Sequence, residues 1–99
     1  MALDFRRRRV TIPTGTGRRS INDSVTFSSN VNRADIALNG FQLDYVNSDH
    51  HINVVEIDTD IISRSHNTVN FRIEADYADK NFDDKYRGYV EVLVIADVG

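Results

Sequence analysis

The amino-acid sequence predicts an all-β domain, a six-stranded antiparallel β-sandwich. Apolar and polar residues alternate along several segments with a period of two, which is typical of strands that bury one face. Turn-forming residues separate these segments at short intervals, and no segment shows helical periodicity for longer than one turn. With 99 residues, 40% of them hydrophobic, the chain is expected to form a single domain, residues 1–99.

The first half of the chain contains three expected strands. They cover residues 5–13, 24–27 and 35–46. The Gly and Thr residues at 14–17 form a flexible turn after the first strand, and a polar loop precedes the third.

The third strand contains a break in its alternation. Ile36 and Leu38 share a face with Phe41 only if one residue is skipped, and Asn39-Gly40 lies at the skip. A β-bulge with glycine at its special position explains this pattern. A tight hairpin is the alternative, because Asn-Gly is a strong turn signal. The bulge is favoured, since a hairpin would leave two very short strands.

The second half of the chain contains the other three expected strands, at residues 52–63, 69–77 and 89–97. In two of them one face is defined by every second residue. These residues are Val55, Ile57, Thr59 and Ile61 in the fourth strand, and Phe71, Ile73, Ala75 and Tyr77 in the fifth. The sixth strand is apolar at nearly every position, so both of its faces are predicted to be covered.

The net charge of −3 is unevenly distributed along the chain. Residues 1–19 hold six arginines and one aspartate, so the rest of the chain is acidic. The four arginines at 6–9 could form a basic arm for nucleic acid or an anionic membrane. They could instead belong to an edge strand whose charges prevent edge-to-edge pairing. No aromatic residues are interleaved with these arginines, so no nucleic-acid partner is expected.

Several function classes are disfavoured by what the sequence lacks. Without cysteine there are no disulfides and no thiolate zinc sites. No apolar run has the length of a membrane span, so membrane insertion is not expected. No signal peptide is visible, although an extracellular or surface location stays open. Asp58 and Asp60 lie only ~7 Å apart on one strand, and no nucleophile motif is present, so an enzyme is not expected.

An ordered set of short motifs runs through residues 8–98. It begins with Val25-Thr26-Phe27 and continues with an apolar strand running into Phe41-Gln42-Leu43-Asp44. Ile52-Asn53-Val54 then opens a long strand, Val69-Asn70-Phe71 starts the next, and 92–96 closes the domain. In this order the motifs resemble the H-type lectin domain of snail agglutinins. The ordered set with its spacing carries the resemblance, rather than any single motif.

The resemblance implies a six-stranded antiparallel sandwich that assembles as a homotrimer or hexamer. It also implies glycan partners, with sugar sites between neighbouring subunits. We further expect the arginine-rich first strand to lie near the acidic surface of a neighbouring subunit. Two departures concern the sugar site. Asn53 stands where the snail lectins place a sugar-binding arginine, and Ala78-Asp79 stands near their Trp-His pair. The specificity of those lectins is therefore not expected here.

Carboxylates, amides and aromatic rings are predicted to converge at one loop-rich end of the sandwich. Carboxylates accept hydroxyl hydrogens, and aromatic faces cover the apolar side of a sugar ring. Tyr77 or Tyr86 is expected to be the stacking face, and no cofactor is expected. The predicted ligand-binding residues are His51, Asn53, Tyr77, Asp79, Asp83, Asp84 and Tyr86.

Two segments raise the question of a metal site. In Asp49-His50-His51, adjacent imidazoles on a strand would point to opposite faces, and zinc would need further ligands. Asp79-x-Asn81-x-Asp83 begins like a calcium loop, but Asp84 stands where such a loop needs glycine. A solvated or hydrogen-bonding role is the favoured interpretation of both segments, and no metal is assigned.

Two functions remain. The first is a carbohydrate-binding, lectin-like module that is multivalent through oligomerisation. The second is a structural oligomerisation or adaptor domain, as in a tail-fibre or surface assembly, without a sugar site.

Overall fold

The structure is a computed structural model that describes residues 2–46, 54–78 and 84–99, and these ranges contain strands and no helix. The strands are β1 (Ala2–Gly15), β2 (Arg19–Thr26), β3 (Val31–Tyr45), β4 (Val54–Ser65), β5 (Thr68–Ala78) and β6 (Tyr86–Val98). All four strand pairings are antiparallel, so the predicted six-stranded antiparallel sandwich is confirmed. No helix in the described ranges is long and apolar enough to cross a membrane.

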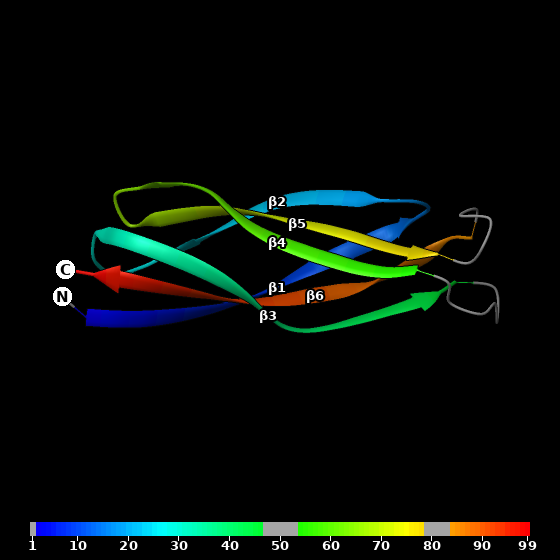
Figure 1. Ribbon diagram of the computed structural model, residues 1–99, viewed down its shortest axis with the longest axis horizontal. Helices are drawn as coiled ribbons and strands as arrows, with labels where there is room; N and C mark the ends of the chain where they lie inside the picture. The colour runs from blue at the N-terminus through cyan, green and yellow to red at the C-terminus, as the bar shows by residue number, and fades with distance from the viewer. Residues whose placement is uncertain (1, 47–53, 79–83) are drawn as a thin grey trace.

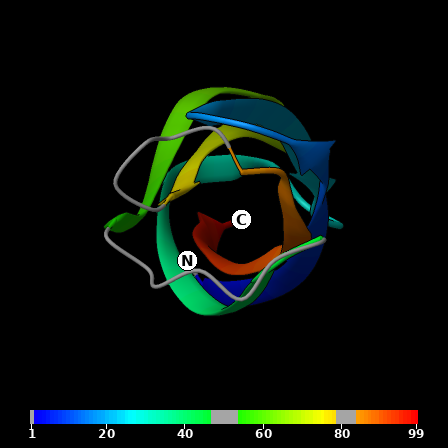
Figure 2. The same ribbon diagram turned by 90° about the vertical axis from the view of Figure 1, so that its right-hand side faces the viewer.

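The strands form two layers, which Figure 1 shows along the length of the molecule and Figure 2 shows end-on. Sheet A has the order β1-β6-β3, and sheet B has the order β2-β5-β4. The molecule is a rod with extents of 49 × 18 × 17 Å. Its two termini lie at the same end, because Ala2 pairs with Val98.

The inner faces of β5 and β6 form the core. Every second residue of each strand is turned inward, as the alternation predicted for β5. The inward residues of these two strands with at most 1% exposure are Val69, Phe71, Ile73 and Ala75 of β5, and Tyr86, Val90, Val92, Val94 and Ala96 of β6. The prediction that both faces of the sixth strand are covered is wrong in part. Leu93 and Ile95 on the outer face are only half-buried, because none of the described residues forms a further layer on sheet A.

The break in the third strand is a β-bulge, as predicted. Leu38 pairs with Val92 and Gly40 with Glu91, so Asn39 is the inserted residue. Gly40 is not among the described residues with positive φ, so the bulge does not use the left-handed glycine that was expected. The bulge keeps β3 continuous along the whole of β6.

Five strands, β1, β2, β3, β5 and β6, are longer than predicted. The early starts of two of them were hard to predict, because β2 begins at Arg19 rather than at residue 24 and β3 begins at Val31 rather than at residue 35. The segments added to β2 and β3 are mostly polar, and polar composition argues against a strand. Both strands lie at sheet edges, where polar side chains stay in contact with water.

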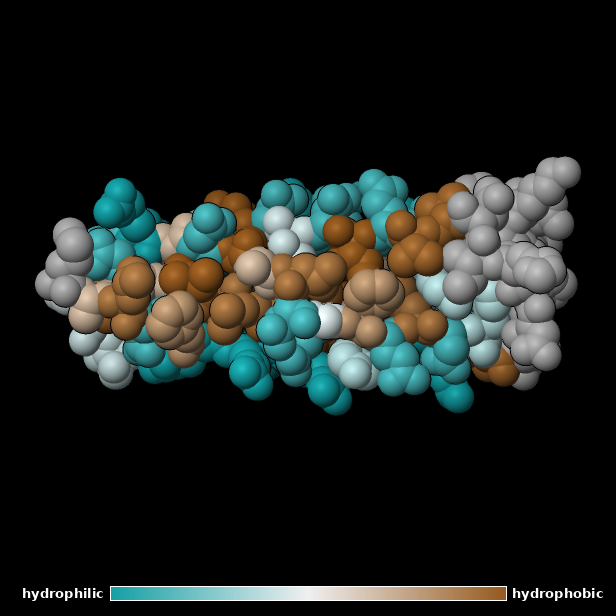
Figure 3. All heavy atoms as spheres, turned by 60° about the horizontal axis from the view of Figure 1, so that its bottom comes forward, coloured by the Kyte–Doolittle hydropathy of each residue, from teal (hydrophilic) through white to brown (hydrophobic). Residues whose placement is uncertain are grey.

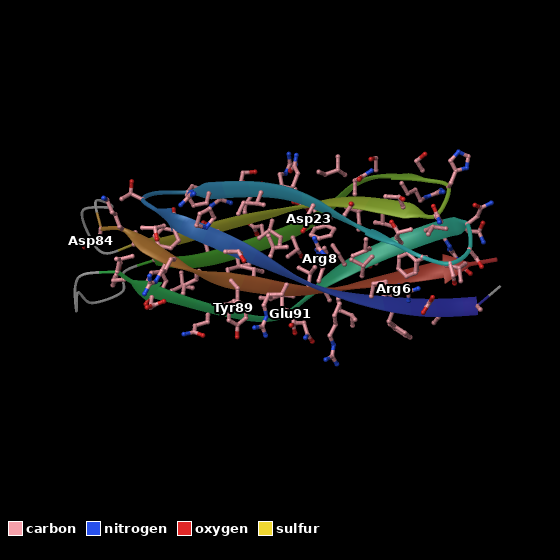
Figure 4. All side chains as sticks on the ribbon, turned by 180° about the vertical axis from the view of Figure 1, so that it is seen from behind. Arg6, Arg8, Asp23, Asp84, Tyr89 and Glu91 are labelled. Carbon is pink, nitrogen blue, oxygen red and sulfur yellow. The ribbon has the colours of Figure 1, made fainter. Side chains whose placement is uncertain are left out.

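The arginines of β1 lie alternately on its two faces. Arg8 faces sheet B and contacts Asp23 of β2 with its Nε 2.9 Å from Oδ2, and Figure 4 shows the two side chains pointing toward one another. Arg6 lies over the ring of Phe27 at 4.9 Å and donates to the carbonyl oxygen of Thr26. These side-chain contacts join the two sheets along β1 and β2, which are not paired with each other in the described part of the chain.

The Arg8–Asp23 pair is expected to make the stability of the fold depend on pH in the acidic range. Burial raises the pKa of Asp23, but the hydrogen bonds from Arg8 and from the Ser24 N–H, with the Arg8 charge, outweigh it and hold the pKa below the usual 3.8. The pair therefore stabilises the fold above about pH 4, and this contribution is lost as the pH falls through the folded-state pKa. Urea unfolding from pH 6 to pH 2 should show a steeper loss of stability for the wild type than for Asp23→Asn. Parallel curves would contradict this role.

Candidate functional site

Four of the seven predicted ligand-binding residues lie outside the described residues. These are His51, Asn53, Asp79 and Asp83. The two segments considered for a metal, 49–51 and 79–83, also lie outside them. Within the described ranges, no group of three His, Asp or Glu side chains is placed to hold a metal ion.

Tyr77 and Tyr86 lie in the core. Tyr86 is 0% and Tyr77 8% exposed, and the Tyr77 ring packs between Tyr45 at 4.8 Å and Tyr86 at 5.8 Å. The Tyr86 hydroxyl lies 2.6 Å from the Gly17 carbonyl oxygen and 3.2 Å from that of Ala75. Burial raises the pKa of both phenols. The cluster joins sheet A to sheet B, and neither Tyr77 nor Tyr86 offers a ring face on which a sugar could stack.

Asp84 is the remaining predicted residue. It is partly buried just before β6, at the end of the rod opposite the termini (Figure 4). The rings of Tyr77 and Tyr86 contact each other beneath the surface, and neither is an exposed stacking face.

A depression of about 410 Å³ lies on the outer face of sheet A, in the half nearer the end opposite the termini. All three strands of the sheet contribute to it. Tyr89 of β6 pairs with Thr11 of β1 on one side and with Gln42 of β3 on the other. Two residues earlier in β6, Arg87 pairs with Asp44 of β3. Figure 4 shows Tyr89 and Glu91 projecting from β6 away from sheet B. We call this site the Tyr89 depression; its lining is Arg9, Thr11, Ile12, Pro13, Thr14, Gln42, Asp44, Arg87, Gly88 and Tyr89.

Gly88 allows two strands to approach closely at the base of the Tyr89 depression. A Cβ atom at this position would lie 1.7 Å from the Gln42 carbonyl oxygen, and the φ of Gly88 is 156°. Only glycine fits this combination without moving β3.

A network of side chains holds Arg9 in place beside the Tyr89 depression. Its guanidinium lies over the Tyr89 ring, 4.0 Å from the centroid, and 3.5 Å from a carboxylate oxygen of Glu91. Glu91 also accepts a hydrogen bond from the amide of Asn39. The bulge thus presents Asn39 to the outer face, where it completes a chain of contacts across the three strands.

The polar groups of the Tyr89 depression differ in how they are partnered. Arg9 is held by Tyr89 and Glu91, whereas the exposed Arg87 makes no ion pair or hydrogen bond within the described part of the chain. Asp44 is also exposed. A guanidinium and a carboxylate, with the amide of Gln42, are therefore available to a ligand on one concave surface.

The outer face of sheet B differs from the Tyr89 depression, because an arginine there is already paired with carboxylates of the chain. Arg18 contacts three carboxylates there, Glu56 at 2.9 Å, Asp58 at 2.8 Å and Glu74 at 3.0 Å. These hydrogen bonds, with that to Glu74 the largest cause, raise the pKa of Arg18. Asp58, which the sequence pairs with Asp60 on one face, is thus engaged by a cation of the chain itself.

The sequence did not identify the residues of the Tyr89 depression. One signal was available: with a period of two, the buried Val90 places Tyr89 on the outer face of its strand. Comparison of the chain with protein-family models, with curated proteins and with solved structures found no match, so the resemblance to the H-type lectin domain stays a prediction.

Proposed function

We propose that the protein is a carbohydrate-binding module and that its sugar site includes the Tyr89 depression. The observation that supports this function is that Asp44, Arg87 and Gln42 line one concave surface together with Pro13 and the Tyr89 ring, over which the Arg9 guanidinium lies. A saccharide ring has hydroxyls that both donate and accept hydrogen bonds and a face of C–H groups. Sites for such ligands combine a few polar groups with an apolar surface.

Self-association belongs to the same proposal. A homotrimer or hexamer, as the lectin resemblance implies, would present several copies of a weak site. Linked sites can gain roughly 10²–10⁴ in avidity without new contacts. Asp84, the one predicted polar residue within the described ranges, lies just before β6 at the end of the rod opposite the termini.

Removing single polar groups of the Tyr89 depression is expected to weaken glycan binding. A hydrogen bond to a charged group contributes about 1.5–3 kcal/mol, so Arg87→Ala and Asp44→Ala should each lower affinity about 10- to 100-fold. Arg72→Ala is the matched control, because Arg72 is an exposed arginine on the outer face of sheet B. The measurement is a glycan array with neutral and acidic glycans, followed by calorimetry with the best ligand.

The outcomes of this experiment are distinct. If the wild type binds a glycan and both variants bind it equally well, the site lies elsewhere. If the wild type binds no glycan, the structural oligomerisation or adaptor role replaces the proposal. One observation favours that second role: large hydrophobic residues such as Leu3 and Phe5 are more than half exposed.

A further inference from the structure

The outer face of sheet A carries a hydrophobic patch near the termini, separate from the Tyr89 depression. Leu3 is 67% and Phe5 52% exposed. Phe5 pairs with Ile95, and Arg7 pairs with Leu93, which itself pairs with Ala37. We call these five apolar residues, Leu3, Phe5, Ala37, Leu93 and Ile95, the terminal patch. Figure 3 shows hydrophobic side chains forming a band along the molecule between hydrophilic ones.

A buried carboxylate lies at the border of the terminal patch. Asp97 lies between Leu3 and Arg33 in the sheet and is 7% exposed. Its Oδ1 has no hydrogen-bond partner among the described residues, and its Oδ2 is 3.8 Å from Arg33. The side chain lines a hollow of about 310 Å³ with Leu3, Arg33, Asp35 and others. A buried acceptor without a donor is costly, which points to a donor supplied from outside the chain.

The same face carries a donor without a partner. Arg7 is exposed and makes no ion pair or hydrogen bond within the described ranges. It lies on the same face of β1 as Leu3, four residues and therefore about 13 Å away. Phe5 lies midway between them.

We propose that two copies of the chain pack face to face through the terminal patch, about a two-fold axis that crosses the strands at Phe5 and Ile95. Arg7 and Leu93 are paired two residues to one side of Phe5 and Ile95, and Leu3 and Asp97 are paired two residues to the other side. Such an axis therefore places the first pair of one copy opposite the second pair of the other copy. Each Arg7 then reaches the hollow beside the Asp97 of the other copy, and the apolar residues cover one another. A two-fold contact uses the same surface on both copies, so both carboxylates gain a partner at once.

This contact is independent of the proposed sugar site. The Tyr89 depression occupies the other half of the outer face and stays open in the dimer. The contact is also compatible with a hexamer of D3 symmetry, which combines two-fold and three-fold interfaces.

Cysteine cross-linking tests the position of the axis, because the natural chain contains no cysteine. Phe5→Cys places its thiol beside that of the partner and should give a disulfide-linked dimer under mild oxidation. Thr11→Cys, on the same face of β1 but far from the axis, is the matched control and should stay uncross-linked. Equal cross-linking of the two variants, or none of Phe5→Cys, would overturn the proposal.

Sedimentation velocity tests the charge pairing. The wild type should sediment as a dimer or a multiple of it at 100 µM, and Arg7→Ala should raise the dissociation constant at least tenfold. Arg72→Ala should leave it unchanged. A monomeric wild type, or equal effects of the two substitutions, would exclude this interface whatever the glycan array shows.

Discussion

Tyr86→Ala is expected to lower the free energy of unfolding by about 3–5 kcal/mol, since it removes a fully buried aromatic ring and leaves a cavity. A domain of this size has roughly 5–15 kcal/mol in total, so the variant will be close to unfolding. Tyr86→Phe keeps the ring and removes only the hydroxyl that contacts Gly17 and Ala75. It should cost about 1–2 kcal/mol. Urea unfolding followed by circular dichroism measures both.

Glycan binding by Tyr86→Ala and Tyr86→Phe shows whether the Tyr86 ring contacts the sugar or only supports the fold. If the ring is structural, Tyr86→Phe retains binding, and Tyr86→Ala loses binding only in proportion to its unfolded fraction. A Tyr86→Ala protein that is as stable as the wild type yet binds no glycan would show that the ring contacts the ligand, as the sequence predicted.

Gly88→Ala is expected to destabilise the domain by about 2–4 kcal/mol. The added Cβ would lie 1.7 Å from the Gln42 carbonyl oxygen, which is backbone and can move only if β3 moves away from β6. The φ of 156° adds strain for any residue with a Cβ. Thermal unfolding of the purified variant measures the loss, and glycan binding should weaken with it because Gln42 lines the Tyr89 depression.

Gly40→Ala is the control for Gly88→Ala. Gly40 lies on the adjacent strand, but a Cβ there meets nothing within 4 Å, and its φ is not positive. Its effect should be below about 1 kcal/mol and can be stabilising, because alanine restricts the unfolded chain. Equal losses for the two glycine variants would show that close strand approach at Gly88 is not the cause.

Much of the fold could be predicted because alternation is a local property of the sequence. The faces of β5 and the skipped residue at Asn39 follow from short segments and need no knowledge of partners. The boundaries of β2 and β3 could not be predicted in the same way, since their polar ends are held as strand by pairing with β5 and β6. Tertiary pairing overrides local composition there.

The candidate site was harder to predict for two physical reasons. Tyr77 lies on the same face of its strand as Phe71, so the alternation of that strand indicated that Tyr77 is buried. The prediction that Tyr77 stacks on a sugar rested on the chemistry of its ring and not on this position. The contact between Arg9 and Tyr89 depends on the β1–β6 register, which joins residues 80 positions apart. No local pattern determines that register.

The pairing of Ala2 with Val98 has a mechanical consequence. A force that pulls the two ends of the chain apart would act across the β1–β6 ladder at its first pair, along its hydrogen bonds rather than across them. The bonds would then break one pair after another, beginning beneath Leu3 and Phe5. Under such a load, whatever covers those two side chains would have to be removed before the ladder could open further.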